Sequence, residues 1–136
     1  MTRLRLAACA MAGLLLAAAC SAQPPRRPRT VEVRIHHSKF IDDSFEVTAG
    51  ATVTFVIRNT DPIDHEFILG DDAVQARHEK GSEQTHGEVP GEVSVPAGAT
   101  ASTTFKFPKP GKLVYACHLP GHFAYGMKGV VSVVSA

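Results

Sequence analysis

The 136-residue sequence contains no tryptophan, three cysteines and three methionines. Cys9 and Cys20 lie in the first twenty residues, so Cys117 is the only thiol in the rest of the chain. That part of the chain therefore has no second cysteine with which to form an intramolecular disulfide. Cys117 is either a buried structural thiol or a ligand.

Long apolar runs are also scarce. The longest, residues 6–19, follows two arginines and is too short and wrongly flanked to span a membrane, so it predicts a secretory signal over residues 1–20. Its end, Leu16–Cys20, resembles a bacterial lipobox, although Ala17 stands where leucine is usual. Cys20 is thus a candidate lipidation site; the alternative is plain signal cleavage and a free secreted product. We expect the protein in the periplasm or on the outer side of the cell membrane, held by a lipid anchor.

Charge of one sign is not in excess. The formal net charge is +1, and removal of two signal arginines leaves 12 basic against 13 acidic residues. This balance gives no indication of nucleic-acid binding. Residues 21–30 are rich in proline and arginine and predict an extended tether, and residues 31–136 are long enough for one domain. In an oxidising compartment an unpaired Cys117 needs an explanation, and metal ligation supplies one because it shields the thiolate.

Helical periodicity is lacking throughout. Apolar and polar residues alternate over 31–36 and 51–59, which is typical of strands with one buried face. Shorter strands are expected at 66–69, 101–107, 112–117 and 129–134. Seven or so short strands with Gly/Pro turns predict an all-β fold, a Greek-key β-sandwich.

Residues 70–91 form a polar stretch that is long for a loop. His78 and His86, with nearby carboxylates, are candidates for a second metal site, but their spacing matches no tight template. A solvated loop is the default interpretation. His36 and His37 are not expected to bind one ion together, because adjacent strand residues point to opposite faces.

Three candidate ligands share one short segment near the C-terminus. Cys117 and Met127 lie ten residues apart, with His122 halfway between them. Thiolate, imidazole and thioether together select copper over magnesium, calcium or manganese, and a blue-copper site needs one Cys, two His and a weak axial Met. The missing histidine must come from elsewhere in the chain, and His65 is the best candidate.

With these residues the chain, from Val31 to its C-terminus, resembles the cupredoxins, the plastocyanin and azurin family of blue-copper proteins. The resemblance implies one copper ion bound by His65, Cys117, His122 and Met127. The four-residue gaps on both sides of His122 are similar to those of rusticyanin. The segments around His65 and Cys117 also look like bacterial cupredoxin-like copper-binding proteins of uncertain role.

The family pattern implies two further features. A backbone N–H near Asn59 or Thr60 is expected to donate a hydrogen bond to the Cys117 sulfur. An apolar rim is expected around His122, whose exposed edge is the exit for electrons in this family. The candidate rim residues are Leu119, Pro120, Phe123 and Tyr125.

Two other copper sites are excluded by missing residues. His118 follows Cys117 as in multicopper oxidases, but Ala116 precedes it, the chain has no His-x-His pair, and one small domain cannot enclose a trinuclear cluster. The binuclear site of oxidase subunit II needs two cysteines on this loop. His118 is therefore expected at the surface or behind the ligands.

The leading functional hypothesis is one-electron transfer to or from a redox protein such as a cytochrome or oxidase, by a monomer that is not an enzyme. The alternative is copper homeostasis, in which the protein sequesters copper or delivers it to a copper-handling partner. In that case the other histidines would recruit extra copper: His36, His37, His78, His86 and His118.

Overall fold

The computed structural model describes residues 28–81, 86–87 and 89–136. The predicted signal, Cys20 and most of the predicted tether lie outside these residues. Within the described part, no helix is both long and apolar enough to cross a membrane.

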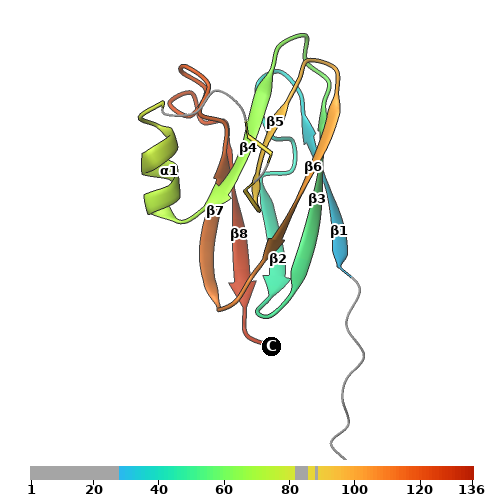
Figure 1. The fold of residues 1–136 in the computed structure, drawn as a ribbon, viewed down its shortest axis with the longest axis vertical. Coiled ribbons are helices and arrows are strands. Elements are labelled where there is room, and N and C mark those ends of the chain that lie inside the picture. Colours follow the sequence, from blue (N-terminus) through green and yellow to red (C-terminus); the bar gives the residue numbers. More distant parts are fainter. Residues whose placement is uncertain (1–27, 82–85, 88) are drawn as a thin grey trace, which may run out of the picture.

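In the described part of the chain, eight strands form two facing sheets (Figure 1). The three-stranded sheet has the order β1-β3-β6, and the five-stranded sheet has the order β2-β8-β7-β4-β5. Strand β1 pairs in parallel with β3 and β2 with β8, whereas the other neighbours are antiparallel. The predicted β-sandwich is thereby confirmed. The strand bounds are β1 Arg29–Ile35, β2 Ser44–Thr48, β3 Thr52–Asn59, β4 His65–Gly70, β5 Glu92–Val95, β6 Thr100–Lys106, β7 Gly111–Ala116 and β8 Lys128–Val134.

The strand limits differ from the sequence-based expectation in two respects. Strand β1 begins at Arg29, inside the predicted tether, because its parallel register with β3 extends back to the pair Arg29 and Val53. Strands β2 and β5, of five and four residues, were not predicted. Both are edge strands: β2 pairs with β8, and β5 pairs with β4. This pairing stabilises them although their alternating sequence patterns are too short to be recognised.

The predicted loop at residues 70–91 contains a helix, α1 (Asp72–His78), so the expectation of no helix was wrong. Asp71 caps its start by accepting the N–H groups of Ala73 and Val74. Asp72 in the first turn and Arg77 in the last complement the helix dipole. With seven residues the helix is too short to show a periodic pattern, so capping is its main sequence signal.

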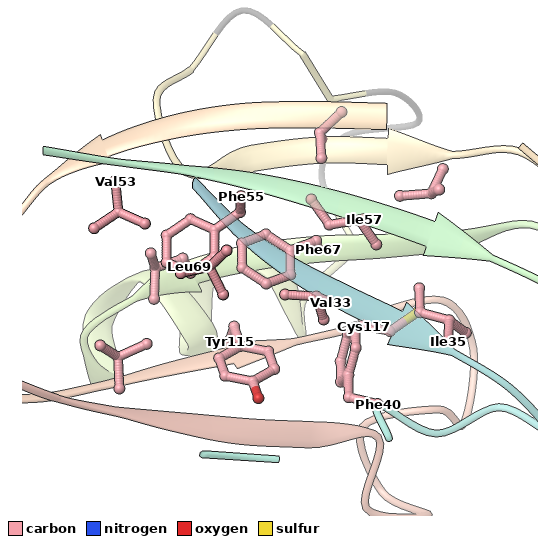
Figure 2. Packing of buried hydrophobic residues seen from close by; sticks show 14 of the residues in the cluster. Val33, Ile35, Phe40, Val53, Phe55, Ile57, Phe67, Leu69, Tyr115 and Cys117 are labelled. Atoms are coloured by element: carbon pink, nitrogen blue, oxygen red, sulfur yellow. The ribbon is translucent and has the colours of Figure 1, made fainter. Parts of the chain in front are cut away.

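The core lies between the two sheets and is rich in aromatic rings (Figure 2). The ring of Phe67 lies 5.2 Å from the rings of both Phe55 and Tyr115, measured between centroids. Cys117 belongs to the same cluster and is fully buried. The candidate thiolate therefore lies at the end of a close-packed core, which limits its movement.

Strand β4 is buried on both faces, which is unusual for an antiparallel strand. His65, Phe67 and Leu69 share the face toward the core, whereas Glu66 and Ile68 share the opposite, outer face. Helix α1 packs beside β4 and β7 on this outer side (Figure 1). The helix is fastened there by Gln75, whose amide donates to the carbonyls of Ile68 and Val114.

Candidate metal centre

Cys117 and Met127 flank one loop at the end of the sandwich. Cys117 directly follows β7 and Met127 directly precedes β8. The Cys117 N–H donates to the Met127 carbonyl at 3.1 Å, so the antiparallel pairing of β7 and β8 continues for one more residue pair. The two sulfur-containing residues are therefore held opposite each other, and both are buried.

The intervening loop is folded back on itself by four backbone hydrogen bonds. His122 donates to the Leu119 carbonyl at 2.9 Å, and Met127 donates to the His122 carbonyl at 3.0 Å. The other two bonds join Tyr125 to Gly121 and Gly126 to Phe123. Gly121 and Gly126 have φ angles of 86° and 87°, which glycine adopts without strain. The loop thus fixes His122 between the two sulfur residues.

His65 reaches the same place from the first position of β4. Its side chain is fully buried, and its Nδ1 atom lies 3.9 Å from Cys117 Sγ. His122 Nδ1 lies 3.2 Å from the same sulfur. The potential ligand atoms of His65, Cys117 and His122 all lie within 4.8 Å of one another. The structure therefore brings together three of the four predicted ligands, and places the fourth, Met127, at the adjacent loop end.

The Cys117 sulfur accepts a hydrogen bond from the backbone N–H of Glu66, at 3.3 Å. The expectation that this donor lies near Asn59 or Thr60 was wrong. Asn59 instead organises the turn before His65: its amide donates to the Ile63 and Pro96 carbonyls, and its oxygen accepts the Asp61 N–H. Glu66 follows a candidate ligand in sequence and points its N–H toward the sulfur because β4 runs past the end of β7.

Asp61 is a functional residue that the sequence-based interpretation missed. Its carboxylate lies 2.9 Å from His65 Nε2 and accepts the backbone N–H groups of His37 and Ser38, both at 2.7 Å. With Nε2–H donating to Asp61, His65 presents an unprotonated Nδ1 toward Cys117, as a metal-ligating imidazole requires. The spacing of Asp61 and His65, four residues in a turn, was the available signal.

Burial controls the acid–base state of the site. Burial raises the pKa of the Cys117 thiol to about 11. The pKa of His122 is lowered, first by burial and then by the neighbouring His65. Burial alone would raise the pKa of Asp61, but hydrogen bonds from Ser38 and His37 and the His65 ring outweigh it and hold that pKa below its usual value. The His122 imidazole is thus kept neutral and able to bind a metal, which must displace the Cys117 thiol proton.

His118 lies outside the three-ligand cluster, but it is not a surface residue. Its side chain is only 2% exposed, and it contacts Glu79 and Gln75 at 2.9 and 2.7 Å. Its ring stacks on Phe123, a predicted rim residue, at 4.8 Å. Tyr125, another predicted rim residue, is 89% exposed. Of these two aromatic residues, Phe123 therefore packs against His118, whereas Tyr125 projects into solvent.

His36 and His37 follow β1 in a turn and are not on a strand, so the argument from strand alternation does not apply to them. The two rings contact each other, with centroids 3.8 Å apart, and His36 Nδ1 lies 2.9 Å from Thr60 Oγ1. Within the described residues, neither histidine joins a group of three potential ligands.

The residues at the end of the sandwich fit a copper ion. A buried thiolate donor and two imidazole Nδ1 atoms converge on one point, and a thioether residue is buried beside them. This is the soft and borderline donor set that copper prefers. Each imidazole arrives from a different segment of the fold, so the separation of the donors is set by the packed sandwich.

A sequence profile described as copper binding proteins of the plastocyanin/azurin family matches residues 29–134. The chain belongs to this family. Copper-resistant cuproprotein CopI of Pseudomonas aeruginosa is 32% identical over 144 aligned residues, which cover 82% of this chain and 80% of that protein. Membership of this cupredoxin family establishes copper as the cofactor that the fold is built to hold.

Solved structures with the same fold include two auracyanins. Auracyanin B superposes with a TM-score of 0.67 at 28% identity, covering 80% of this chain and 91% of the other. Auracyanin A of Chloroflexus aurantiacus, described as a "blue" copper protein, has a TM-score of 0.63 at 25% identity, covering 79% and 100%. The family resemblance expected from the ligand loop is therefore confirmed.

Proposed function

We propose that the chain is an exported blue-copper protein that carries single electrons through a centre formed by His65, Cys117, His122 and Met127. The observation that carries the proposal is the convergence of two imidazole Nδ1 atoms on the buried Cys117 sulfur. The bound copper supplies a one-electron change between its cuprous and cupric states. The protein contributes a donor set that suits neither state fully.

Rigidity supports this role. His65 is held by Asp61, Cys117 by the Glu66 N–H, and His122 by the hydrogen-bonded loop. A site that changes little between oxidation states loses and gains an electron without a large rearrangement. His122 is partly exposed, so its outer edge offers a route between the buried sulfur and a redox partner such as a cytochrome or oxidase.

Voltammetry of the copper-loaded mature protein tests the proposal. We expect a reversible wave of one electron per copper ion, with no loss of copper on repeated cycling. Cys117→Ala should abolish the wave. His37→Asn should keep it, because it removes an imidazole outside the ligand group and retains the backbone N–H that donates to Asp61. An irreversible wave, or release of copper on reduction, would rule out an electron carrier.

Copper resistance is the second candidate, and the specific observation in its favour is the similarity to CopI of P. aeruginosa, whose name describes it as copper-resistant. For this role the protein would bind copper in the cell envelope and protect the cell from it. A strain lacking the protein should then grow less well than its parent in excess copper, and a Cys117→Ala copy should fail to restore growth. Equal growth of all strains would reject this candidate.

Export and lipidation belong to the same proposal. An unpaired buried cysteine survives in an oxidising compartment when copper shields it. The predicted signal would deliver the chain there, with Cys20 as the lipid anchor. Radiolabelled palmitate should be incorporated into the wild-type protein and not into Cys20→Ser; equal labelling of the two, or none, would contradict lipidation at this residue.

A single copper-binding domain of this kind is expected to act as a monomer and without catalysis.

A further inference from the structure

A second group of potential ligands lies on the outer face of β4 and β5. Glu66 pairs with Ser94 and Ile68 with Glu92 across these antiparallel strands, so all four side chains share the face covered by α1. Glu66 is 5% and Glu92 3% exposed. Two buried carboxylates on one face need positive partners, because burial of an uncompensated charge is costly.

Two histidines approach these carboxylates from the segment that follows β4. His78 is the last residue of α1, and its Nε2 lies 3.2 Å from Glu92 Oε2. His86 Nδ1 lies 3.4 Å from the same oxygen. The backbone of His86 is tied to β5 by its N–H, which donates to Ser94 Oγ, and by its carbonyl, which accepts the Ser94 N–H. One ligand atom each from His78, His86 and Glu92 lie within 4.8 Å of one another.

Each of the three residues is also held at its far side. His78 Nδ1 lies 2.9 Å from the Val74 carbonyl, so Nδ1 carries the proton and Nε2 faces the cluster with a lone pair. Arg77 donates to Glu92 Oε1 at 3.0 Å, which leaves Oε2 for the cluster. Glu66 Oε1 lies 3.4 Å from His86 Nε2, with His86 Nδ1 on the cluster side. Ligands oriented in this way by outer partners are typical of metal sites.

We propose that His78, His86 and Glu92 bind a divalent transition-metal cation of the zinc and copper(II) class. Two imidazoles and one carboxylate are a donor set that such borderline cations accept. A doubly charged ion would also compensate the buried Glu66 carboxylate and share with Arg77 the compensation of Glu92. A hollow lined by Glu66, His78, His86 and His118 adjoins the cluster and gives the ion a path of entry and room for a further ligand.

The second site shares no ligand with the Cys117 centre, and its existence does not depend on the electron-carrying role. Glu66 nevertheless connects the two, because its N–H donates to Cys117 Sγ while its side chain lies next to His86. The two sites thus occupy opposite faces of β4. A cation at the second site adds positive charge near the copper, so it should raise the copper reduction potential.

The test uses the mature protein loaded with copper and reduced, since cuprous copper is colourless and keeps the Cys117 centre filled. Titration with Co²⁺ should produce visible absorption that saturates at one equivalent and is reversed by Zn²⁺. His86→Gln and Glu92→Gln should each weaken Co²⁺ binding by about tenfold or more. His37→Asn removes an imidazole in a turn outside the cluster, at a φ of 51° that Asn tolerates, and should bind Co²⁺ as the wild type does.

Retention of the oxidised copper spectrum in the two glutamine variants shows that they fold. NMR of the unmodified protein supplies a second measurement that needs no variant: Zn²⁺ should shift the ring nitrogens of His78 and His86 and leave those of His37 unchanged. The proposal is overturned if the wild type takes up no Co²⁺, if both glutamine variants bind it as the wild type does, or if Zn²⁺ shifts other histidines instead.

Discussion

At the scale of single residues, the charge of Asp61 is expected to affect both the stability of the fold and the copper reduction potential. Its carboxylate orients His65 and accepts two backbone N–H groups, and it is only 4% exposed. Asp61→Asn should lower the free energy of unfolding by about 1–3 kcal/mol, because N–H donors lose a charged acceptor. It should also raise the copper reduction potential, because a negative charge close to His65 disappears.

Chemical denaturation and voltammetry check both effects. The matched control is Asp42→Asn, which removes the same charge from an exposed ion pair with Arg34. That variant should change stability by less than about 1 kcal/mol. If Asp61→Asn left both the stability and the potential unchanged, the orienting role of Asp61 would be wrong.

Met127 is the predicted ligand whose contribution is easiest to isolate. Leucine has nearly the same volume, so Met127→Leu should cost less than about 1.5 kcal/mol of stability. Loss of the thioether leaves fewer donors, which favours the cuprous state, so the reduction potential should rise. Voltammetry of the copper-loaded variant measures the change; an unaltered potential would show that the thioether does not contact the copper.

The raised pKa of Cys117 predicts how the stability of the metal-free protein depends on pH. The thiol titrates at about 11 in the fold instead of 9.0, so the folded state holds this proton more tightly than the unfolded chain does. Stability should therefore fall as pH rises from 9 towards 11, by about 3 kcal/mol at most. Above that range the thiol is ionised in both states, so this group should cause no further loss. Urea denaturation at several pH values measures it. Cys117→Ala should lose this part of the pH dependence; an identical slope in both proteins would contradict the shift.

The candidate copper ligands could be chosen from the sequence because their chemistry is rare in this chain. Only one Cys and one Met lie in the domain, and the loop spacing places His122 between them. The residues that orient the ligands could not be found in this way. Asp61 is one of many acidic residues, and the N–H of Glu66 carries no side-chain signature at all. Both residues act on the candidate ligands through contacts that exist only in the folded chain, where β4 runs past the end of β7.

At the scale of elements, close packing between β7 and β8 gives a sharp prediction. Gly129 on β8 lies directly against the Tyr115 ring of β7, and a Cβ at this position would also meet the Asp43 carbonyl at 2.7 Å. Gly129→Ala should therefore destabilise the fold by about 2–3 kcal/mol, since neither the buried ring nor the backbone can move freely.

Thermal denaturation of the metal-free protein measures this loss. The control is Gly87→Ala, because nothing lies within 4 Å of a Cβ added at that glycine. It should leave the midpoint nearly unchanged. Equal midpoints for Gly129→Ala and the wild type would show that the two strands separate more easily than their packing indicates.

The elements with a strong alternating pattern were predictable, and those that depend on tertiary contacts were not. Strand β3 was expected at residues 51–59 and runs over Thr52–Asn59. Strand β5 has four residues, and α1 has seven. Such short segments are stable because β4 pairs with the first and packs against the second. Their sequence patterns are correspondingly weak.

At the scale of the whole molecule, the sandwich places two ligand groups on opposite faces of one strand. His65 faces the core and the other candidate copper ligands, and Glu66 faces the second cluster. The copper group was predictable because it combines a soft-ligand loop with one distant histidine. The second group was only suspected, because Glu92 joins His78 and His86 through a strand pairing that sequence spacing does not reveal.

We propose above all that one copper ion binds at Cys117 together with His65, His122 and Met127. The most direct test is an optical and electron-spin titration of the mature protein with copper(II), beside the same titration of Cys117→Ala. We expect an intense thiolate-to-copper charge-transfer band that saturates at one equivalent and is absent from the variant. Weak bands that keep growing beyond one equivalent and survive the loss of Cys117 would contradict it.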